Sequence, residues 1–124
     1  DVARWTNPIY GLRMRVEHWT NASAQGRAAA RNMVALATGR QDLRKAFADV
    51  PYFWSDQYGQ KIQMVGWHEG HDRVELDRSG DVPGPLARFY RNGRLIAAAG
   101  VNAPRVVMRL RRQIEDEARA AEAA

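Results

Sequence analysis

The chain has 124 residues, which is enough for one domain that buries roughly two-thirds of the surface its unfolded form exposes. Its apolar content of 45% and charged content of 27% are those of an ordinary soluble globular protein. No apolar run approaches the roughly 20 residues that a membrane helix needs. The start, DVARWTNPIY, lacks the apolar core of a signal peptide. We therefore expect a soluble protein that has no membrane partner.

The net charge of +5 comes from 17 arginines and 2 lysines set against 14 acidic residues. These charges are spread along the chain, and no long block of like charge occurs. A solvated surface with many ion pairs is the plainest interpretation, followed by an acidic protein partner; we expect no nucleic acid. The chain has no cysteine, which excludes a disulfide and a thiolate metal site and is compatible with a reducing, cytoplasmic setting.

The first third of the chain combines an irregular segment with a helix. Residues 1–15 show no period and contain Pro8 and Gly11, so we expect no regular structure there. Residues 20–37, TNASAQGRAAARNMVALA, predict a helix. Its expected inner face consists mostly of small residues, which allow close approach to the helix axis: Ala22, Ala29, Met33 and Leu36.

The ends of this helix carry capping signals. Thr20 or Asn21 is the expected N-cap, because a short oxygen-bearing side chain can satisfy a backbone N–H that has no partner within the helix. Gly39 stands where a left-handed C-terminal cap is favoured. A second, short helical turn is expected near residues 42–48, and Pro51 ends it.

Two segments in the middle of the chain alternate apolar and polar residues, as half-buried strands do. They are KIQMVGW at 61–67 and DRVELDR at 72–78. The first strand places Ile62 and Met64 on one face and Lys61 and Gln63 on the other. In the second strand, Val74 and Leu76 are expected to point inward.

A hairpin and a long helix complete the chain. LARFYRNGRLIAAAGV, residues 86–101, predicts a hairpin because Asn92-Gly93 supplies the two positive-φ residues of a type I′ turn. A closing helix follows, with Asn102 as N-cap and Pro104 in its first turn. Its apolar stripe is Val107, Leu110, Ile114, Ala118 and Ala121. Arg111 and Arg112 stand four residues before Glu115 and Asp116 on the outer face.

The expected fold class is therefore α+β: an antiparallel β-meander of about four or five strands, with a long N-terminal helix and a long C-terminal helix. The closing helix must cover one face of the sheet. The first helix belongs partly elsewhere, because its small-residue face is not needed by the sheet.

Three common kinds of chemical site find little support. His68 and His71 in HEGHD could ligate zinc, but Gly70 places them in a turn and no third ligand is evident, so we predict no metal. Ser55 with Asp56 lacks a nucleophile elbow, and we assign no catalytic residue. Neither glycine-rich nucleotide-binding fingerprint is present, so any nucleotide-binding fold lies outside this sequence.

Two segments leave a functional and a structural interpretation open. In RVEHWTNASAQG, Glu17, His18 and Trp19 precede the helix start, where an anion or a polarised carbonyl could bind; Trp19 could equally be a packing staple. In VPYFWSDQYG, residues 50–59, the aromatic residues could form a core strand or one wall of a site for a flat molecule.

Taken together, several segments resemble one family along nearly the whole chain. The family is that of the FAD-dependent, NAD(P)H-using ferredoxin reductases of the oxygenase-coupled type, which includes putidaredoxin reductase; apoptosis-inducing factor is a more distant relative. The segments are Asp1-Val2-Ala3, RVEHWTNASAQGRAAARNM, VPYFWSDQYGQKIQMVG and VNAPRVVMRLRRQI.

The resemblance implies a fragment of a larger enzyme. Residues 1–40 would be the last piece of an FAD-binding domain, and residues 50–124 the reductase C-terminal α+β domain. The parent would be an FAD-dependent NAD(P)H:ferredoxin oxidoreductase that passes electrons to a ferredoxin-type iron–sulfur protein. The fragment alone would be inactive and would hold no FAD, because most of the adenine and pyrophosphate site is missing.

The resemblance also implies roles for individual residues. Asp1 would be the aspartate that holds the ribityl chain of FAD, and the helix that begins near Trp19 would face the pyrimidine edge of the flavin. Glu17 and His18 would lie near the nicotinamide and flavin rings. Trp54 would lie beside the isoalloxazine, with polar neighbours Ser55, Asp56 and Gln57, while Phe53 and Tyr58 would anchor the segment to the sheet.

A second hypothesis assigns the chain a binding role without catalysis. The chain would act as an α+β interaction module, with a possible homodimer formed through the small-residue face of the first helix and the aromatic segment, since exposed apolar patches favour association.

Overall fold

The computed structural model describes residues 1–122 and confirms the α+β class, with a long helix in each half of the chain. The chain forms two compact units, residues 1–49 and residues from 50 onward. The first contains β1 (Trp5–Asn7), β2 (Leu12–Met14), α1 (Trp19–Ala37) and the 3₁₀ turn η1 (Gln41–Leu43). The second contains β3 (Tyr52–Gln57), β4 (Gln60–Gly66), β5 (Arg73–Asp77), β6 (Leu86–Arg91), β7 (Arg94–Val101) and α2 (Pro104–Glu122).

The segment expected to be irregular, residues 1–15, contains a small hairpin, so that expectation is wrong. β1 and β2 pair antiparallel, and Asn7 holds the hairpin to residues far along the chain. The buried Asn7 side chain donates from Nδ2 to the carbonyl of Asp49, 2.8 Å away, and accepts from the backbone N–H of Ile9. Strands of three residues are too short to show alternation, and their support comes from contacts that no local pattern reveals.

Helix α1 begins one residue earlier than expected. His18 is the N-cap, so neither Thr20 nor Asn21 caps the helix; Asn21 is buried and donates from Nδ2 to the carbonyl of Val16. The C-terminal end of α1 has the left-handed cap that was expected at Gly39. Gly39 has φ +72°, and the N–H groups of Gly39 and Arg40 donate to the carbonyls of Leu36 and Ala35, which is a Schellman cap.

The predicted inner face of α1 is wrong. Ala22, Ala29, Met33 and Leu36 are all exposed, whereas Asn21 and Ala35 are buried. Two asparagines account for this rotation of the helix. Asn21 binds the segment before the helix, and Asn32 binds the segment after it, because Asn32 donates to the Lys45 carbonyl and accepts from the Lys45 N–H.

The same asparagine explains a second difference. The helical turn expected near residues 42–48 is only the short η1, which ends at Leu43. Since Asn32 takes both backbone groups of Lys45, these groups are not available for a helical ladder, and the backbone of Arg44 is already extended.

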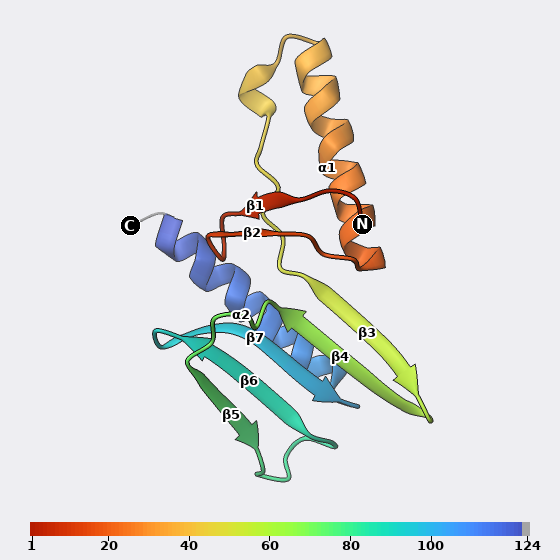
Figure 1. Ribbon diagram of the computed structural model, residues 1–124, viewed down its shortest axis with the longest axis vertical. Coiled ribbons are helices and arrows are strands. Elements are labelled where there is room, and N and C mark those ends of the chain that lie inside the picture. The colour runs from red at the N-terminus through yellow and green to blue at the C-terminus, as the bar shows by residue number, and fades with distance from the viewer. Residues whose placement is uncertain (123–124) are drawn as a thin grey trace. The chain divides into compact units, whose positions relative to one another are not determined.

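The second unit is a five-stranded antiparallel sheet in the order β3-β4-β7-β6-β5, with β3 and β5 at its edges (Figure 1). The β6–β7 turn has Asn92 at φ +52° and Gly93 at φ +77°, which confirms the expected type I′ turn. The β3–β4 turn is of the same kind, with Tyr58 at φ +50° and Gly59 at φ +74°. A bulge at Ile96 brings its carbonyl against Gly66, where a Cβ atom would lie 2.1 Å from the oxygen.

Helix α2 crosses one face of this sheet over β7 and β4 (Figure 1). Four of the five predicted stripe residues are buried, namely Val107, Leu110, Ile114 and Ala118, whereas Ala121 is exposed. The helix approaches closely because β7 presents small residues: a Cβ atom at Gly100 would lie 3.0 Å from Val107. The helix starts at Pro104, while the Asn102 side chain binds Gln60 and Lys61 at the start of β4 and does not cap the helix.

Helix α2 covers the face of the sheet that lies opposite to Val74 and Leu76. Val65 and Gln63 are buried on this face, while Ile62, Val74 and Leu76 lie on the opposite face and are exposed. The alternation itself is confirmed, but the expected inward direction of Val74 and Leu76 is wrong. Alternation separates the two faces of a strand, but it does not determine which face the helix covers. Among residues 1–122, neither helix is apolar over a length that could cross a bilayer.

The expectation that Tyr58 anchors its segment to the sheet is wrong. It is 101% exposed and occupies a left-handed backbone position that favours asparagine or glycine. Substitution Tyr58→Asn should therefore stabilise the second unit by about 0.5–1 kcal/mol, because it relieves part of the left-handed strain and loses no packing. Urea unfolding followed by circular dichroism measures this difference, with Tyr58→Phe as the neutral control; a Tyr58→Asn variant of lower stability would contradict it.

Candidate functional site

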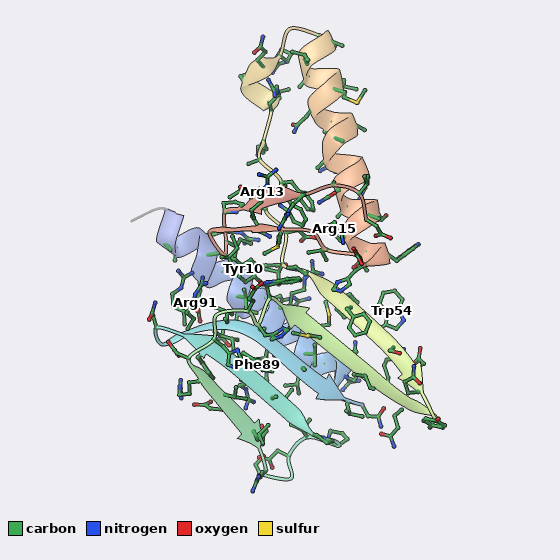
Figure 2. The ribbon with its side chains drawn as sticks, viewed as in Figure 1. Tyr10, Arg13, Arg15, Trp54, Phe89 and Arg91 are labelled. Atoms are coloured by element: carbon green, nitrogen blue, oxygen red, sulfur yellow. The ribbon has the colours of Figure 1, made fainter. Side chains whose placement is uncertain are left out.

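The first unit carries one group of predicted site residues at the start of α1. Arg15, which is labelled in Figure 2, forms an ion pair of 2.5 Å with Glu17 on the surface of the segment that leads into the helix. His18 is the extended N-cap residue, and its carbonyl accepts the first helical hydrogen bond, from the Ala22 N–H at 3.0 Å. Trp19 is the first helical residue and is 76% exposed. Three adjacent residues thus place a carboxylate, an imidazole and an indole at one helix terminus.

The electrostatics of this helix start favour negative charge. The first turn of α1 contains no acidic residue, and the N-cap side chain makes no capping bond to the helix, so nothing within α1 offsets the positive end of its dipole. Burial lowers the pKa of the His18 imidazole below its ordinary value of 6.5, so His18 is neutral at pH 7. As the pH falls below 6.5, His18 binds a proton in the unfolded chain more readily than in the folded one. Acid therefore favours the unfolded chain at this residue, and the free energy of unfolding decreases.

Asp1 stands apart from this group along the chain. It is exposed and belongs to the segment that precedes β1. Its carboxylate is accessible to a ligand.

The second unit carries the other group on the edge strand β3 (Figure 2). Trp54 stacks on Tyr52 with ring centroids 5.5 Å apart and an interplanar angle of 25°. The Tyr52 hydroxyl accepts a hydrogen bond of 2.8 Å from Nε2 of Gln63, which is only 2% exposed. Gln63 lies directly opposite Trp54 in the β3–β4 pairing. Because Trp54 keeps 38% of its surface exposed, the stack presents an indole that the sheet holds in place.

Because side chains alternate along a strand, the other two residues of this group, Ser55 and Asp56, lie on opposite faces of the sheet. Asp56 shares a face with Trp54 and forms an ion pair of 2.8 Å with Lys61. Ser55 points to the opposite face, where its hydroxyl accepts a hydrogen bond from Gln57. The side chains of Trp54 and Asp56 therefore form one surface, and Ser55 can join them only through its backbone.

Two residues that hold Trp54 were missed by the sequence reasoning. Tyr52 was noted only as part of an aromatic run, and Gln63 was placed on a polar strand face, although it is buried. Its Oε1 atom has no hydrogen-bond partner among the residues that the structure describes. The sequence alone does not give the β3–β4 register. That register puts Gln63 opposite Trp54 and would have predicted that Gln63 lies beside the aromatic pair.

The HEGHD segment forms a turn, as expected. Gly70 has φ +78°, and the rings of His68 and His71 both lie against Phe89, at 5.7 and 5.3 Å between centroids. Within residues 1–122, no group of three histidine or acidic side chains is placed to hold a metal ion.

Comparison with known proteins identifies the family. The reductase C-terminal family matches residues 52–124, which is more than half of the chain, so the chain belongs to that family. The ferredoxin–NAD(+) reductase component of the anthranilate 1,2-dioxygenase system of Burkholderia cepacia is 35% identical over 116 residues, which cover 92% of this chain and 27% of the relative. Putidaredoxin reductase of Pseudomonas putida is 34% identical over 104 residues, covering 84% of this chain and 23% of the relative.

Solved structures agree with this assignment. The crystal structure of Fdr9 superposes with a TM-score of 0.83 at 36% identity, covering 94% of this chain and 29% of that one. The covalent putidaredoxin reductase–putidaredoxin complex gives a TM-score of 0.75 at 30% identity, covering 94% and 26%. The chain thus spans about a quarter of the length of these relatives.

The contributions of Tyr52 and Gln63 to the free energy of unfolding should be coupled, because their side chains share a hydrogen bond. Tyr52→Phe leaves the buried Gln63 amide without its acceptor, and we expect a loss of about 1–3 kcal/mol in the free energy of unfolding. Adding Gln63→Leu should recover most of this loss, because both polar groups are then gone. A double-mutant cycle in urea measures the coupling; additive effects of the two substitutions would contradict it.

Proposed function

We propose that this chain is the C-terminal part of an FAD-dependent ferredoxin reductase. The parent enzyme would pass electrons from NAD(P)H through FAD to a ferredoxin-type iron–sulfur protein. The observation that carries the proposal is the reductase C-terminal match over residues 52–124, together with relatives that are named as ferredoxin reductases. Because NAD(P)H is an intracellular reductant, the proposed setting is cytoplasmic.

We assign the two parts of the chain to two domains of the parent. Residues 1–40 would end the FAD-binding domain, and residues 50–124 would be the C-terminal domain. The division of the chain into units at residue 49 supports this assignment. The exposed apolar side chains of α1, which include Met33, Val34 and Leu36, support it as well, since these side chains suit burial against a larger domain.

The residues present fit a flavin. Trp54 offers a planar, partly exposed ring that Tyr52 and Gln63 hold in place, as a neighbour of a flat isoalloxazine requires. The start of α1 offers a positive dipole end that no acidic side chain of its first turn offsets. FAD would supply the redox chemistry, accepting a hydride and releasing single electrons. The residues that we propose for its binding are Asp1, Glu17, His18, Trp19, Trp54, Ser55 and Asp56.

The chain's own contribution is electrostatic and positional. A helix terminus stabilises a nearby negative charge by about 0.3–1 kcal/mol, and by up to about 2 kcal/mol when partly buried. For a two-electron couple, 1.4 kcal/mol corresponds to about 30 mV. The start of α1 would therefore raise the reduction potential by tens of millivolts at most. Neutral His18 would add no charge there at pH 7.

The role of Trp54 can be tested in the full-length parent. We expect Trp54→Ala to weaken flavin retention about tenfold and to slow NAD(P)H-dependent reduction of a ferredoxin, because the ring loses its stacking neighbour. Flavin absorbance after dialysis and steady-state rates measure these effects. Trp67→Ala is the matched control, since Trp67 lies beyond the end of β4 and bonds to Glu69.

Two outcomes would contradict the proposal. A parent that reduces no acceptor with NADH or NADPH would refute the reductase assignment. Stoichiometric flavin in the purified 124-residue chain would refute the view that this chain holds only part of the site and is inactive alone.

A second candidate function is association without catalysis. The exposed apolar residues of α1 and the open sheet face with Phe53, Ile62, Val74 and Leu76 favour it. If this candidate is correct, the isolated chain forms a homodimer, and Leu76→Asp together with Val74→Asp returns it to a monomer. Light scattering over a concentration series measures this; a strict monomer at the highest concentration would exclude it.

A further inference from the structure

Gln63 has the only polar side chain in the interior of the second unit. Among the buried residues from position 50 to 122, all the others are apolar, glycine or proline. Only one end of its amide has a partner: Nε2 donates to the Tyr52 hydroxyl at 2.8 Å, whereas Oε1 has no hydrogen-bond partner within residues 1–122. Burial of an amide with an unpaired oxygen costs free energy. An apolar side chain of similar size would avoid this cost.

The place of Gln63 in the sheet connects the interior to the edge. Gln63 lies in a cross-strand row between Trp54 of β3 and Gly100 of β7. At Gly100 the helix α2 packs close on the sheet, since a Cβ atom there would lie 3.0 Å from Val107. Gln63 therefore belongs to the closely packed interior, whereas Trp54 belongs to an edge strand and is 38% exposed.

The bond from Gln63 to Tyr52 runs diagonally across the β3–β4 pair. In the register Tyr52 lies opposite Val65, while Gln63 lies opposite Trp54. The tyrosine ring therefore leans along β3 towards Trp54, and the two rings stack with their centroids 5.5 Å apart. Without the bond, the Tyr52 ring would be free to take another rotamer, and Trp54 would lose a fixed neighbour.

We propose that Gln63 is a positioning residue of the reductase. Through Tyr52 it sets the place and the angle of the Trp54 ring, against which the flavin ring would lie. This inference rests on the proposed function, because Trp54 is the proposed neighbour of FAD. A local cost in stability at a residue that orients a site is typical of functional sites. Catalysis repays such a cost, because small displacements of reacting groups lower rates strongly.

The test uses Y52F/Q63L, which removes both polar groups and keeps a ring at position 52. We expect its free energy of unfolding in urea to stay close to that of the wild type, because no buried polar group is left unpaired by the substitutions. The position of Trp54 and the activity should change nevertheless. A purely structural role of Gln63 predicts that activity changes only as far as stability does.

The first readout needs no flavin. The 124-residue chain labelled with 5-fluorotryptophan gives one ¹⁹F resonance for each of its four tryptophans, and Trp54→Phe identifies the resonance of Trp54. We expect Y52F/Q63L to broaden this resonance or to move it towards its position in the urea-unfolded chain, while the other three stay in place. An unchanged Trp54 resonance would overturn the positioning role.

The second readout uses the full-length parent with FAD bound. For Y52F/Q63L we expect the kcat with a small quinone as acceptor to fall about fivefold, with the KM for NAD(P)H changed less than about twofold. The flavin emission should rise towards that of the Trp54→Phe parent, because an indole in contact with a flavin quenches its fluorescence.

Leu95→Ala is the matched control. Leu95 is buried at the start of β7, outside the part of that strand that pairs with β4. This variant should lower the stability of the second unit, because it leaves a cavity. The Trp54 resonance, the flavin emission and the kcat should nevertheless match those of the wild type. If Leu95→Ala lowers kcat as much as Y52F/Q63L does, the effect is not specific to the pair and the proposal is overturned.

Two further outcomes separate the possible failures. If the Trp54 resonance moves in Y52F/Q63L while the flavin emission and kcat do not change, Gln63 orders the ring without a role in the reaction. The proposal is then overturned and the reductase assignment stands. If the wild-type parent reduces no acceptor with NADH or NADPH, the reductase assignment itself fails, and the positioning role fails with it.

Discussion

The close packing of α2 on β7 is the contact on which the second unit depends. The small residues Ala98 and Gly100 let the helix approach until Val107 touches the strand, and this depth buries Leu110 and Ile114 as well. Because α2 occupies that face, the other face of the sheet remains open, with Val74 and Leu76 exposed. The packing also orients the outer side of α2, which carries the exposed Arg105, Arg109 and Arg112. A larger residue at position 100 would change all three features together.

Much of this fold could be predicted from local patterns, and the part that could not depends on contacts between distant residues. Asn92-Gly93 defined its hairpin because the turn chemistry is contained in two residues. The stripe of α2 was evident from its spacing. The β1–β2 hairpin was missed because Asn7 draws its support from Asp49. The covered face of the sheet was misjudged because alternation indicates two faces and does not indicate which one is buried.

In the candidate site, too, local motifs identified some residues, while contacts between distant residues could not be predicted. Apart from Asp1, the residues assigned by resemblance fall into two groups, one at the start of α1 and one on β3, and the structure adds what no motif contained: the bond from Gln63 to Tyr52, the ring on which Trp54 stacks. A buried glutamine beneath an exposed tryptophan restricts the motion of the ring without filling its outer face. A side chain that serves as a wall for a flat ligand needs both properties. Ser55, by contrast, belongs to the same motif and faces away from this surface.

The bonds of Asn102 have a mechanical consequence. Asn102 stands just before α2 and bonds to Gln60 and Lys61 at the start of β4, so a single residue links the entry of the helix to the β3–β4 hairpin that carries Trp54. In the proposed reductase, such a link would favour electron transfer, because its rate falls steeply with distance and a fixed spacing is worth more than tight binding.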